Sequence, residues 1–241
     1  METSVLFSSF NDLIYCLNCF HKASSQSNDL CLDITNSFMD LSGKVGKKGK
    51  EGMKYRGTWN NLIPRWAILR FTQIHMKVLS NFLGRGTDLL ECVPLQRLFT
   101  GIDISSDSIK IALKNATFEN LDPHFYSIKV ADARNEPFCF FDLILSHPPY
   151  FKCISYSKNR KDLSRASNFE EFISSIQMVA SHSFSHLRMN GHLLLGIGDN
   201  RKNCSVIAVG FEVILKYLLA GLSIKLLVAL FTHFLVYKEA I

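Results

Sequence analysis

The stretch "KVLSNFLGRGTDLLEC", residues 77–92, joins an apolar run to a helical segment through a glycine turn. The apolar run predicts a strand over 77–81, and the segment that follows predicts a helix over 86–93. Gly84 and Gly86 lie in the turn, where the missing side chains let the backbone approach a ligand, and Thr87 opens the helix. This order predicts the first unit of an α/β fold.

The same alternation continues toward the C-terminus, where apolar strand-length segments are separated by helical ones. The expected strands are Lys77–Asn81, Leu98–Ile104, Phe125–Val130, Asp142–Leu145, His192–Ile197, 222–230 and 232–238. The expected helices are 62–73, 86–93, 106–116, 169–187 and 206–220. The pattern predicts a Rossmann-like, doubly wound α/β fold with a mostly parallel seven-stranded sheet and an antiparallel C-terminal hairpin.

Length and composition predict one domain with an N-terminal extension. Residues 1–54 are rich in Ser, Asn, Asp and Cys and end in the Gly/Lys-rich linker "GKVGKKGKEGMK", residues 43–54. We expect this extension to be poorly ordered and residues 55–241 to form the domain. The net charge of +6 suits a polyanionic partner, although a solvated basic surface explains it equally well.

The seven cysteines are odd in number and scattered, which favours a reducing compartment, so we expect a cytoplasmic protein. The pair Cys16 and Cys19 lacks a second pair or a histidine cluster, and we expect no metal. The most lipid-like segment, "LSIKLLVALFTHFLVY" at 222–237, is shorter than a bilayer span of about 20 residues and contains Lys225 and His233. We expect no secretory signal and no membrane association.

Polar residues follow successive expected strands at the point where each strand ends. Asp103 ends the second strand, about 20 residues after Gly84, at the distance from which an acid accepts hydrogen bonds from ribose hydroxyls. Asp132 ends the third strand. After the fourth strand, the prolines of "SHPPY", residues 146–150, prevent the ladder from continuing. These features predict a ligand site at the carboxyl edge of the sheet.

The order "FLGRGT", "GIDI", "ADAR", "SHPPY" resembles the S-adenosylmethionine-dependent methyltransferases that modify exocyclic amines of bases, and more narrowly the DNA N4-cytosine/N6-adenine methylase family. The resemblance runs from about residue 55 to the C-terminus. It implies a class I methyltransferase fold and methyl transfer to cytosine N4 or adenine N6. The DNA would be double-stranded with the target base flipped out. A restriction-modification system with a cognate restriction endonuclease is the implied setting.

The resemblance also assigns roles to residues. The cofactor, S-adenosylmethionine, would contact Phe82, Gly84, Gly86, Thr87, Asp103, Ile104, Asp132 and Ala133. The catalytic set would be Ser146, His147, Pro148, Pro149 and Tyr150. Within these sets Gly84, Gly86 and Thr87 would hold the methionine end, Asp103 the ribose and Asp132 the adenine amine.

The chemistry explains the residue types of the proline corner. An exocyclic amine is a poor nucleophile because its lone pair is delocalised into the ring, and acceptors for its hydrogens make it more nucleophilic. The Pro148 carbonyl is one acceptor, and the residue at the head of the motif is the second. Tyr150 offers a face on which the base stacks. If His147 is an acceptor it must be neutral, so its ordinary pKa predicts lower activity below about pH 6.5. A packing role for His147 stays open.

Two further features leave alternatives open. Ser80-Asn81-Phe82 stands where the family has Asp-Pro-Phe, and Arg85 stands where a small residue is common, which predicts a weakened cofactor site. The loop "FKCISYSKNRKDLSRAS", residues 151–167, carries basic residues suited to phosphates, or is a mobile exposed loop. The alternatives are an RNA base methyltransferase and a degenerate fold that only binds nucleic acid. We expect Trp59 and Trp66 to pack, and Asp199 to line the base pocket or cap a turn.

Overall fold

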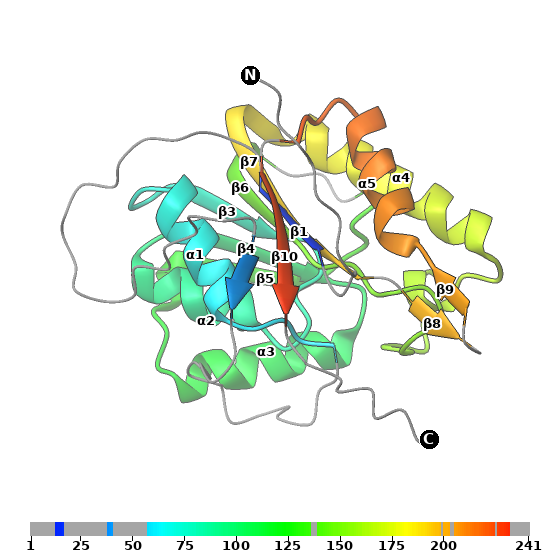
Figure 1. The fold of residues 1–241 in the computed structure, drawn as a ribbon. Helices are drawn as coiled ribbons and strands as arrows, with labels where there is room; N and C mark the ends of the chain where they lie inside the picture. Colours follow the sequence, from blue (N-terminus) through cyan, green and yellow to red (C-terminus); the bar gives the residue numbers. More distant parts are fainter. Residues whose placement is uncertain are drawn as a thin grey trace, which may run out of the picture.

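The computed structural model describes residues 13–16, 38–40, 57–135, 139–198, 200–202, 205–224 and 226–231 (Figure 1). The strands are β1 Leu13–Cys16, β2 Phe38–Asp40, β3 Lys77–Ser80, β4 Leu98–Asp103, β5 Tyr126–Val130, β6 Phe141–Ser146, β7 Leu187–Ile197, β8 Asn200–Lys202, β9 Ser205–Ile207 and β10 Leu226–Phe231. The α-helices are α1 Leu62–Phe71, α2 Thr87–Cys92, α3 Ser106–Phe118, α4 Phe169–Ser185 and α5 Val209–Leu219.

The main sheet has the strand order β2-β10-β1-β7-β6-β3-β4-β5. Its five strands from β7 to β5 are parallel to one another, whereas β1 runs antiparallel to both β7 and β10. From β3 the chain winds outward through β4 to β5 and then returns to the other side of β3 with β6. The neighbouring carboxyl ends of β3 and β6 therefore form the switch point at which α/β sheets bind ligands.

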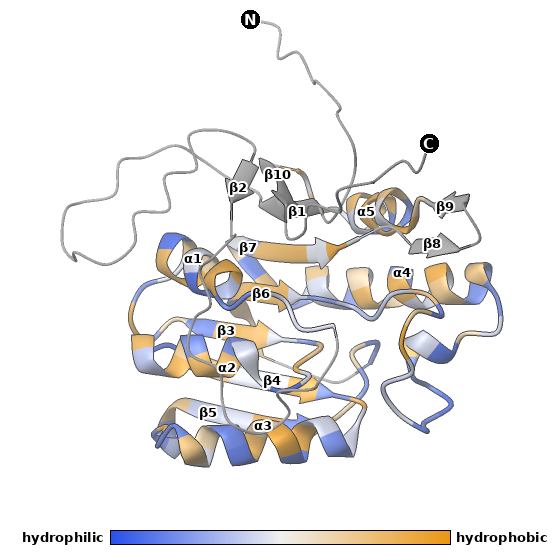
Figure 2. Cartoon of the chain, turned by 60° about the horizontal axis from the view of Figure 1, so that its bottom comes forward, coloured by the Kyte–Doolittle hydropathy of each residue, from blue (hydrophilic) through white to orange (hydrophobic). Residues whose placement is uncertain are grey.

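Figure 2 shows the parallel strands side by side, from β7 to β5. Helices cover both faces of this sheet. Alternate residues of each strand face opposite sides, so both sides must be apolar. Val78, Leu143 and Leu145 pack with α1, α2 and α3, while Leu79 and Ile144 pack with α4 and α5. This double burial explains why the strands read as continuous apolar runs in the sequence.

The parallel α/β sheet confirms the expected architecture, with corrections at the edges. Within the described residues the sheet has eight strands where seven were expected, and two of them, β1 and β2, come from the segment expected to be an extension. The C-terminal hairpin is not confirmed: β10 pairs with β1, and residues 232–238 lie outside the described residues. The domain boundary at 54 and 55 also lies outside them and stays a prediction.

Smaller differences concern individual elements. Strand β7 begins at Leu187 rather than at His192, and the β8–β9 hairpin occupies the start of the helix expected at 206–220. Asp199, expected at the site edge, lies outside the described residues. Among the helices that the structure describes, none is long and apolar enough to cross a membrane.

Candidate functional site

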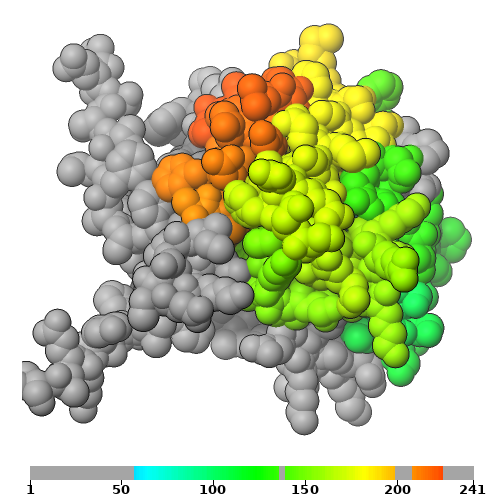
Figure 3. All heavy atoms as spheres, turned by 90° about the vertical axis from the view of Figure 1, so that its right-hand side faces the viewer, coloured from blue at the N-terminus to red at the C-terminus, as the bar shows by residue number. Residues whose placement is uncertain are grey.

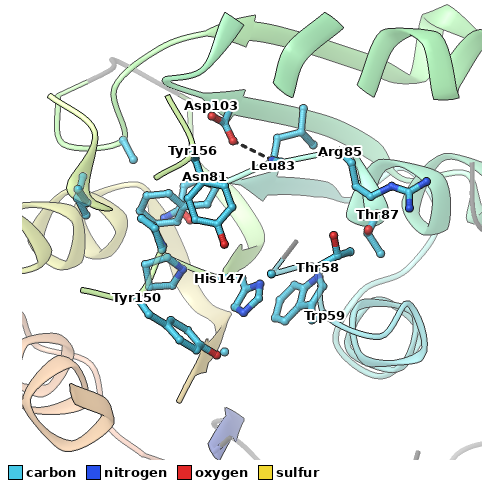
Figure 4. Close-up of a pocket in the computed structure, with 18 of the residues that line it drawn as sticks. Thr58, Trp59, Asn81, Leu83, Arg85, Thr87, Asp103, His147, Tyr150 and Tyr156 are labelled. Atoms are coloured by element: carbon cyan, nitrogen blue, oxygen red, sulfur yellow. Dashed lines mark hydrogen bonds between the residues drawn. The ribbon is translucent and has the colours of Figure 1, made fainter. Parts of the chain in front are cut away.

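A cavity of about 390 Å³ opens at the carboxyl edge of the sheet, around the switch point between β3 and β6 (Figure 4). The tips of β3, β4, β6 and β7 form its floor. Residues 57–60 and the loop after the proline corner form its sides. This volume is in the range of pockets that enclose a small-molecule ligand.

Most of the predicted site residues lie on the wall of this cavity, where the structure brings together segments that are far apart in the chain. They are Phe82, Gly84, Thr87, Asp103, Ile104, Asp132, Ala133, His147, Pro148, Pro149 and Tyr150. Ser146 and Gly86 are not part of the wall. The roles assigned to the wall residues stay predictions.

Ser146 points away from the cavity. It is fully buried at the end of β6, and its hydroxyl lies 2.9 Å from the hydroxyl of Tyr217 on α5. Because side chains alternate along a strand, Ser146 shares the α5 side of the sheet with Ile144. Its predicted place in the catalytic set is therefore not supported by the geometry, which leaves His147 at the head of the motif.

Gly86 has a conformational role in the glycine turn. Its φ of 90° is strained for any residue with a side chain, and an added Cβ would lie 3.1 Å from the Cβ of Ala112 on α3. Gly84, with φ 54°, lies on the cavity wall, and its N–H donates to a carboxyl oxygen of Asp103 over 2.8 Å. The turn is thereby fixed to the tip of β4.

Asp103 accepts a second hydrogen bond, from the N–H of Ser105 over 2.8 Å. Burial nevertheless raises the pKa of Asp103 to about 6, against the effect of its two N–H donors, and the charge of Asp162 adds to the increase. Each oxygen accepts one of these bonds and keeps a lone pair. Asp103 can therefore accept hydrogen bonds from two further hydroxyls at the cavity.

Asp132, at the next strand tip, is bound by Arg134. The guanidinium donates to both carboxyl oxygens, over 2.9 and 2.7 Å, and also to the carbonyl of Lys161. Burial would raise the pKa of Asp132, but the hydrogen bonds and charge of Arg134 outweigh it and hold that pKa below its usual value. Arg134 thus links the β5 tip to the loop after the proline corner.

His147 lies between aromatic rings, as the close-up shows (Figure 4). Its ring stacks on Trp59, with centroids 4.9 Å apart and planes 6° apart, and meets the edge of Tyr150. Gly196 makes room for this stack, because a Cβ there would lie 2.8 Å from Trp59. Trp59 packs, as expected, against the core and His147, and it also lines the cavity. Trp66 does pack, against Phe71.

Burial lowers the pKa of His147 to about 4, so the imidazole is neutral across the physiological range. This corrects the threshold near pH 6.5 inferred from the ordinary histidine value. Among the described residues, neither the imidazole of His147 nor the carbonyl of Pro148 makes a hydrogen bond. Two acceptors are thus available at the corner.

Ser80, which stands before the glycine turn, contacts a carboxyl group from α2. Ser80 donates over 2.6 Å to Asp88 on α2, and the indole N–H of Trp59 donates to the other oxygen of Asp88 over 2.8 Å. Asp88 is 3% exposed and lies on the cavity wall. Sequence reasoning missed Asp88, since the only available signal was an acid in the first turn of a short helix.

Two more wall residues were missed. The amide nitrogen of Asn81 donates to Ser183, but its buried Oδ1 has no hydrogen-bond partner among the described residues. Asp162 is buried and accepts hydrogen bonds from Ser157 and Ser164. No described group of His, Cys, Asp or Glu is arranged to hold a metal ion.

The loop over 151–167 is held at several points rather than standing free. Asp162 caps a short 3-10 helix at Leu163–Arg165, and Lys152 donates to the carbonyl of Ser167 over 2.6 Å. Lys158 and Arg160 remain exposed beside the cavity. This loop forms part of the outer face in Figure 3, coloured yellow-green.

No family model and no curated protein matches the chain. Solved structures similar to it include TrmN from Thermus thermophilus, with 22% identity and a TM-score of 0.46 over 58% of this chain and 39% of that one. A candidate rRNA methylase from Clostridium thermocellum has 19% identity and a TM-score of 0.48, over 69% and 84% of the two chains. A TehB-like SAM-dependent methyltransferase from Corynebacterium glutamicum has 14% identity and a TM-score of 0.45, over 66% and 72%.

Proposed function

We propose that the chain is a methyltransferase that transfers a methyl group from S-adenosylmethionine to an exocyclic amine of adenine or cytosine in DNA. The observation that carries this proposal is the shared cavity: the Gly84–Asp103 contact and the corner His147–Tyr150 open onto the same space. A cofactor group held by the first would face a base held by the second.

The residues of the cavity suit this cofactor, which carries a positive sulfonium and supplies an already activated methyl group. Among the described residues, the carboxyl groups of Asp88, Asp103, Asp132 and Asp162 and the guanidinium of Arg85 line the cavity. Arg134 pairs with Asp132, which leaves three of these carboxyl groups without an ion pair in this part of the chain. His147 adds no charge because burial keeps its pKa near 4. The lining therefore favours a cation, and the lone pairs that Asp103 keeps suit two ribose hydroxyls.

The corner suits an amine. The Pro148 carbonyl and the neutral imidazole of His147 are acceptors without partners among the described residues, and an amine offers two N–H donors. Tyr150 and the Trp59–His147 stack supply aromatic surface for a flipped base. The chain's own contribution is to hold the amine and its hydrogens in place.

Binding of DNA is supported by the exposed Lys158, Arg160 and Lys161 beside the cavity, since basic side chains there can contact phosphates on either side of a flipped base. We include in the proposal a double-stranded target, a cytoplasmic location and a role in restriction-modification with a cognate endonuclease. The free thiols of Cys92, Cys139 and Cys153 fit a reducing compartment.

Nucleoside mass spectrometry tests this function. The full chain and its Tyr150→Ala variant are expressed in a host without its own DNA methylases, and DNA and RNA are hydrolysed separately. We expect N4-methylcytosine or N6-methyladenine in DNA only with the unmodified chain. Methylation confined to RNA would replace the DNA substrate with an RNA one. If neither methylated nucleoside appears in DNA or RNA although the protein is folded and binds the cofactor, the chain is a fold that no longer catalyses.

A further inference from the structure

Asp88 is a buried carboxyl group in an unusual setting. Both of its oxygens accept hydrogen bonds, but the donors are the neutral Ser80 hydroxyl and Trp59 indole. Among the described residues it forms no ion pair, and the charge that acts on it is that of Glu91, which is also negative. A buried carboxylate without a cation is costly, and its burial together with Glu91 raises its pKa to about 6.

Asp88 is placed where it can contact a ligand in the cavity. It lines that cavity directly after Thr87, whereas Asp103 lies at the tip of β4, and Figure 4 shows Asp103 and Trp59 on different sides of the space. If Asp103 holds the ribose, the part of the cofactor beyond the sulfur extends along the glycine turn toward Thr87 and Asp88. That part carries an ammonium group.

We propose that Asp88 binds the ammonium group at the amino-acid end of the cofactor, with Ser80 and Trp59 orienting its carboxylate. The inference rests on the proposed function. Each carboxyl oxygen keeps a lone pair after accepting from its neutral donor, so an ammonium at the cavity wall completes the pairing. The substitution of Ser80 for the expected acid then moves the charge to α2 rather than removing it.

The test compares two ligands that differ at this end. S-adenosylhomocysteine carries the amino-acid group, and 5′-methylthioadenosine lacks it but keeps the adenosine and the thioether. Calorimetry gives the affinity ratio of the two for the full chain. We expect Asp88→Asn to weaken S-adenosylhomocysteine at least about tenfold, because a buried charge pair is lost, and to leave methylthioadenosine within about twofold.

Two matched variants serve as controls. Glu91→Gln removes an acid one turn along the same helix. Glu91 pairs with Arg65 and is not part of the cavity wall, so this variant should leave the affinity ratio of the two ligands unchanged. Asp103→Asn should weaken both ligands together. The amide introduced by Asp88→Asn can still accept from Trp59 and donate to Ser80, and thermal unfolding without ligand checks that each variant is folded.

The outcomes separate this inference from the function on which it rests. The inference is supported if the affinity of S-adenosylhomocysteine relative to methylthioadenosine falls in Asp88→Asn and is unchanged in Glu91→Gln. An unchanged ratio, or an equal loss of both ligands, overturns it and makes Asp88 a structural residue of the turn. Binding of neither ligand to the unmodified chain overturns the proposed function itself. An analogue with an aminopropyl group, which keeps the amine and lacks the carboxylate, should show the same loss as S-adenosylhomocysteine.

Discussion

The tips of β4 and β5 carry the same residue type at neighbouring positions of one sheet edge, yet their environments are opposite. Asp103 accepts only backbone N–H groups, and burial raises its pKa to about 6. Asp132 accepts hydrogen bonds from Nε and Nη2 of the Arg134 guanidinium, and these bonds and the charge of Arg134 lower its pKa. Asp103 thus has capacity left for a ligand, while Asp132 is largely committed within the protein.

The strongest test of this contrast is cofactor affinity. We expect Asp103→Asn to weaken S-adenosylhomocysteine by about tenfold to hundredfold, because hydrogen bonds to a charged group contribute roughly 1.5–3 kcal/mol. Asp132→Asn should cost less than about tenfold, since Arg134 already occupies both of its oxygens. Calorimetry of both variants measures the difference, and equal losses would mean that the two acids contribute equally to the site.

The contrast also predicts a difference in stability. Arg134→Met should lower the free energy of unfolding by about 1–3 kcal/mol, because it leaves the partly buried Asp132 without its cation and frees the Lys161 carbonyl. Urea unfolding at neutral pH measures this. Arg134→Lys keeps the charge but loses the two-armed contact, so its loss should be smaller. A stable Arg134→Met variant would show that the pair is not a structural link.

A third strand tip extends the comparison. At the end of β6, burial lowers the pKa of His147 to about 4. At saturating cofactor and substrate, activity should therefore persist at pH 5.5, where a histidine with the ordinary pKa of about 6.5 would leave roughly a tenth of it. The pH profile measures this. His147→Asn, which keeps an acceptor, should retain activity without the acid limb near pH 4, whereas an unchanged limb would assign it to another group.

Strand tips were predictable from sequence because apolar runs and glycine turns mark where each strand ends, and this placed Asp103, Asp132 and His147 at one edge. Side-chain direction was not predictable. The strands are buried on both faces, so no alternation of polarity shows which way Ser146 points. Asp88 lies in a helix of 6 residues, and β1 and β2 have 4 and 3 residues, so all three are too short for a periodic signal. Arg134 could equally have pointed to solvent.

The finest test follows the two carboxyl groups themselves. Carbon-detected NMR should place the midpoint of Asp103 at about pH 6 and that of Asp132 below its usual value. In Arg134→Met the midpoint of Asp132 should rise, and that of Asp103 should stay. A midpoint of Asp132 that does not move would mean that Arg134 is not the cause of its low pKa.

The two midpoints imply opposite effects on stability. Because the folded pKa of Asp103 is raised, its contribution is favourable at low pH and is lost as the pH rises from the unfolded value of about 4 through 6, an effect on the order of 3 kcal/mol. The folded pKa of Asp132 is lowered, so its contribution is present above about pH 4 and is lost as the pH falls through the folded value. Asp103→Asn should therefore flatten the decline in stability between pH 4 and 6, and Asp132→Asn should leave that decline in place. At neutral pH the ionised Asp103 thus lowers the stability of the fold, whereas Asp132, paired with Arg134, raises it.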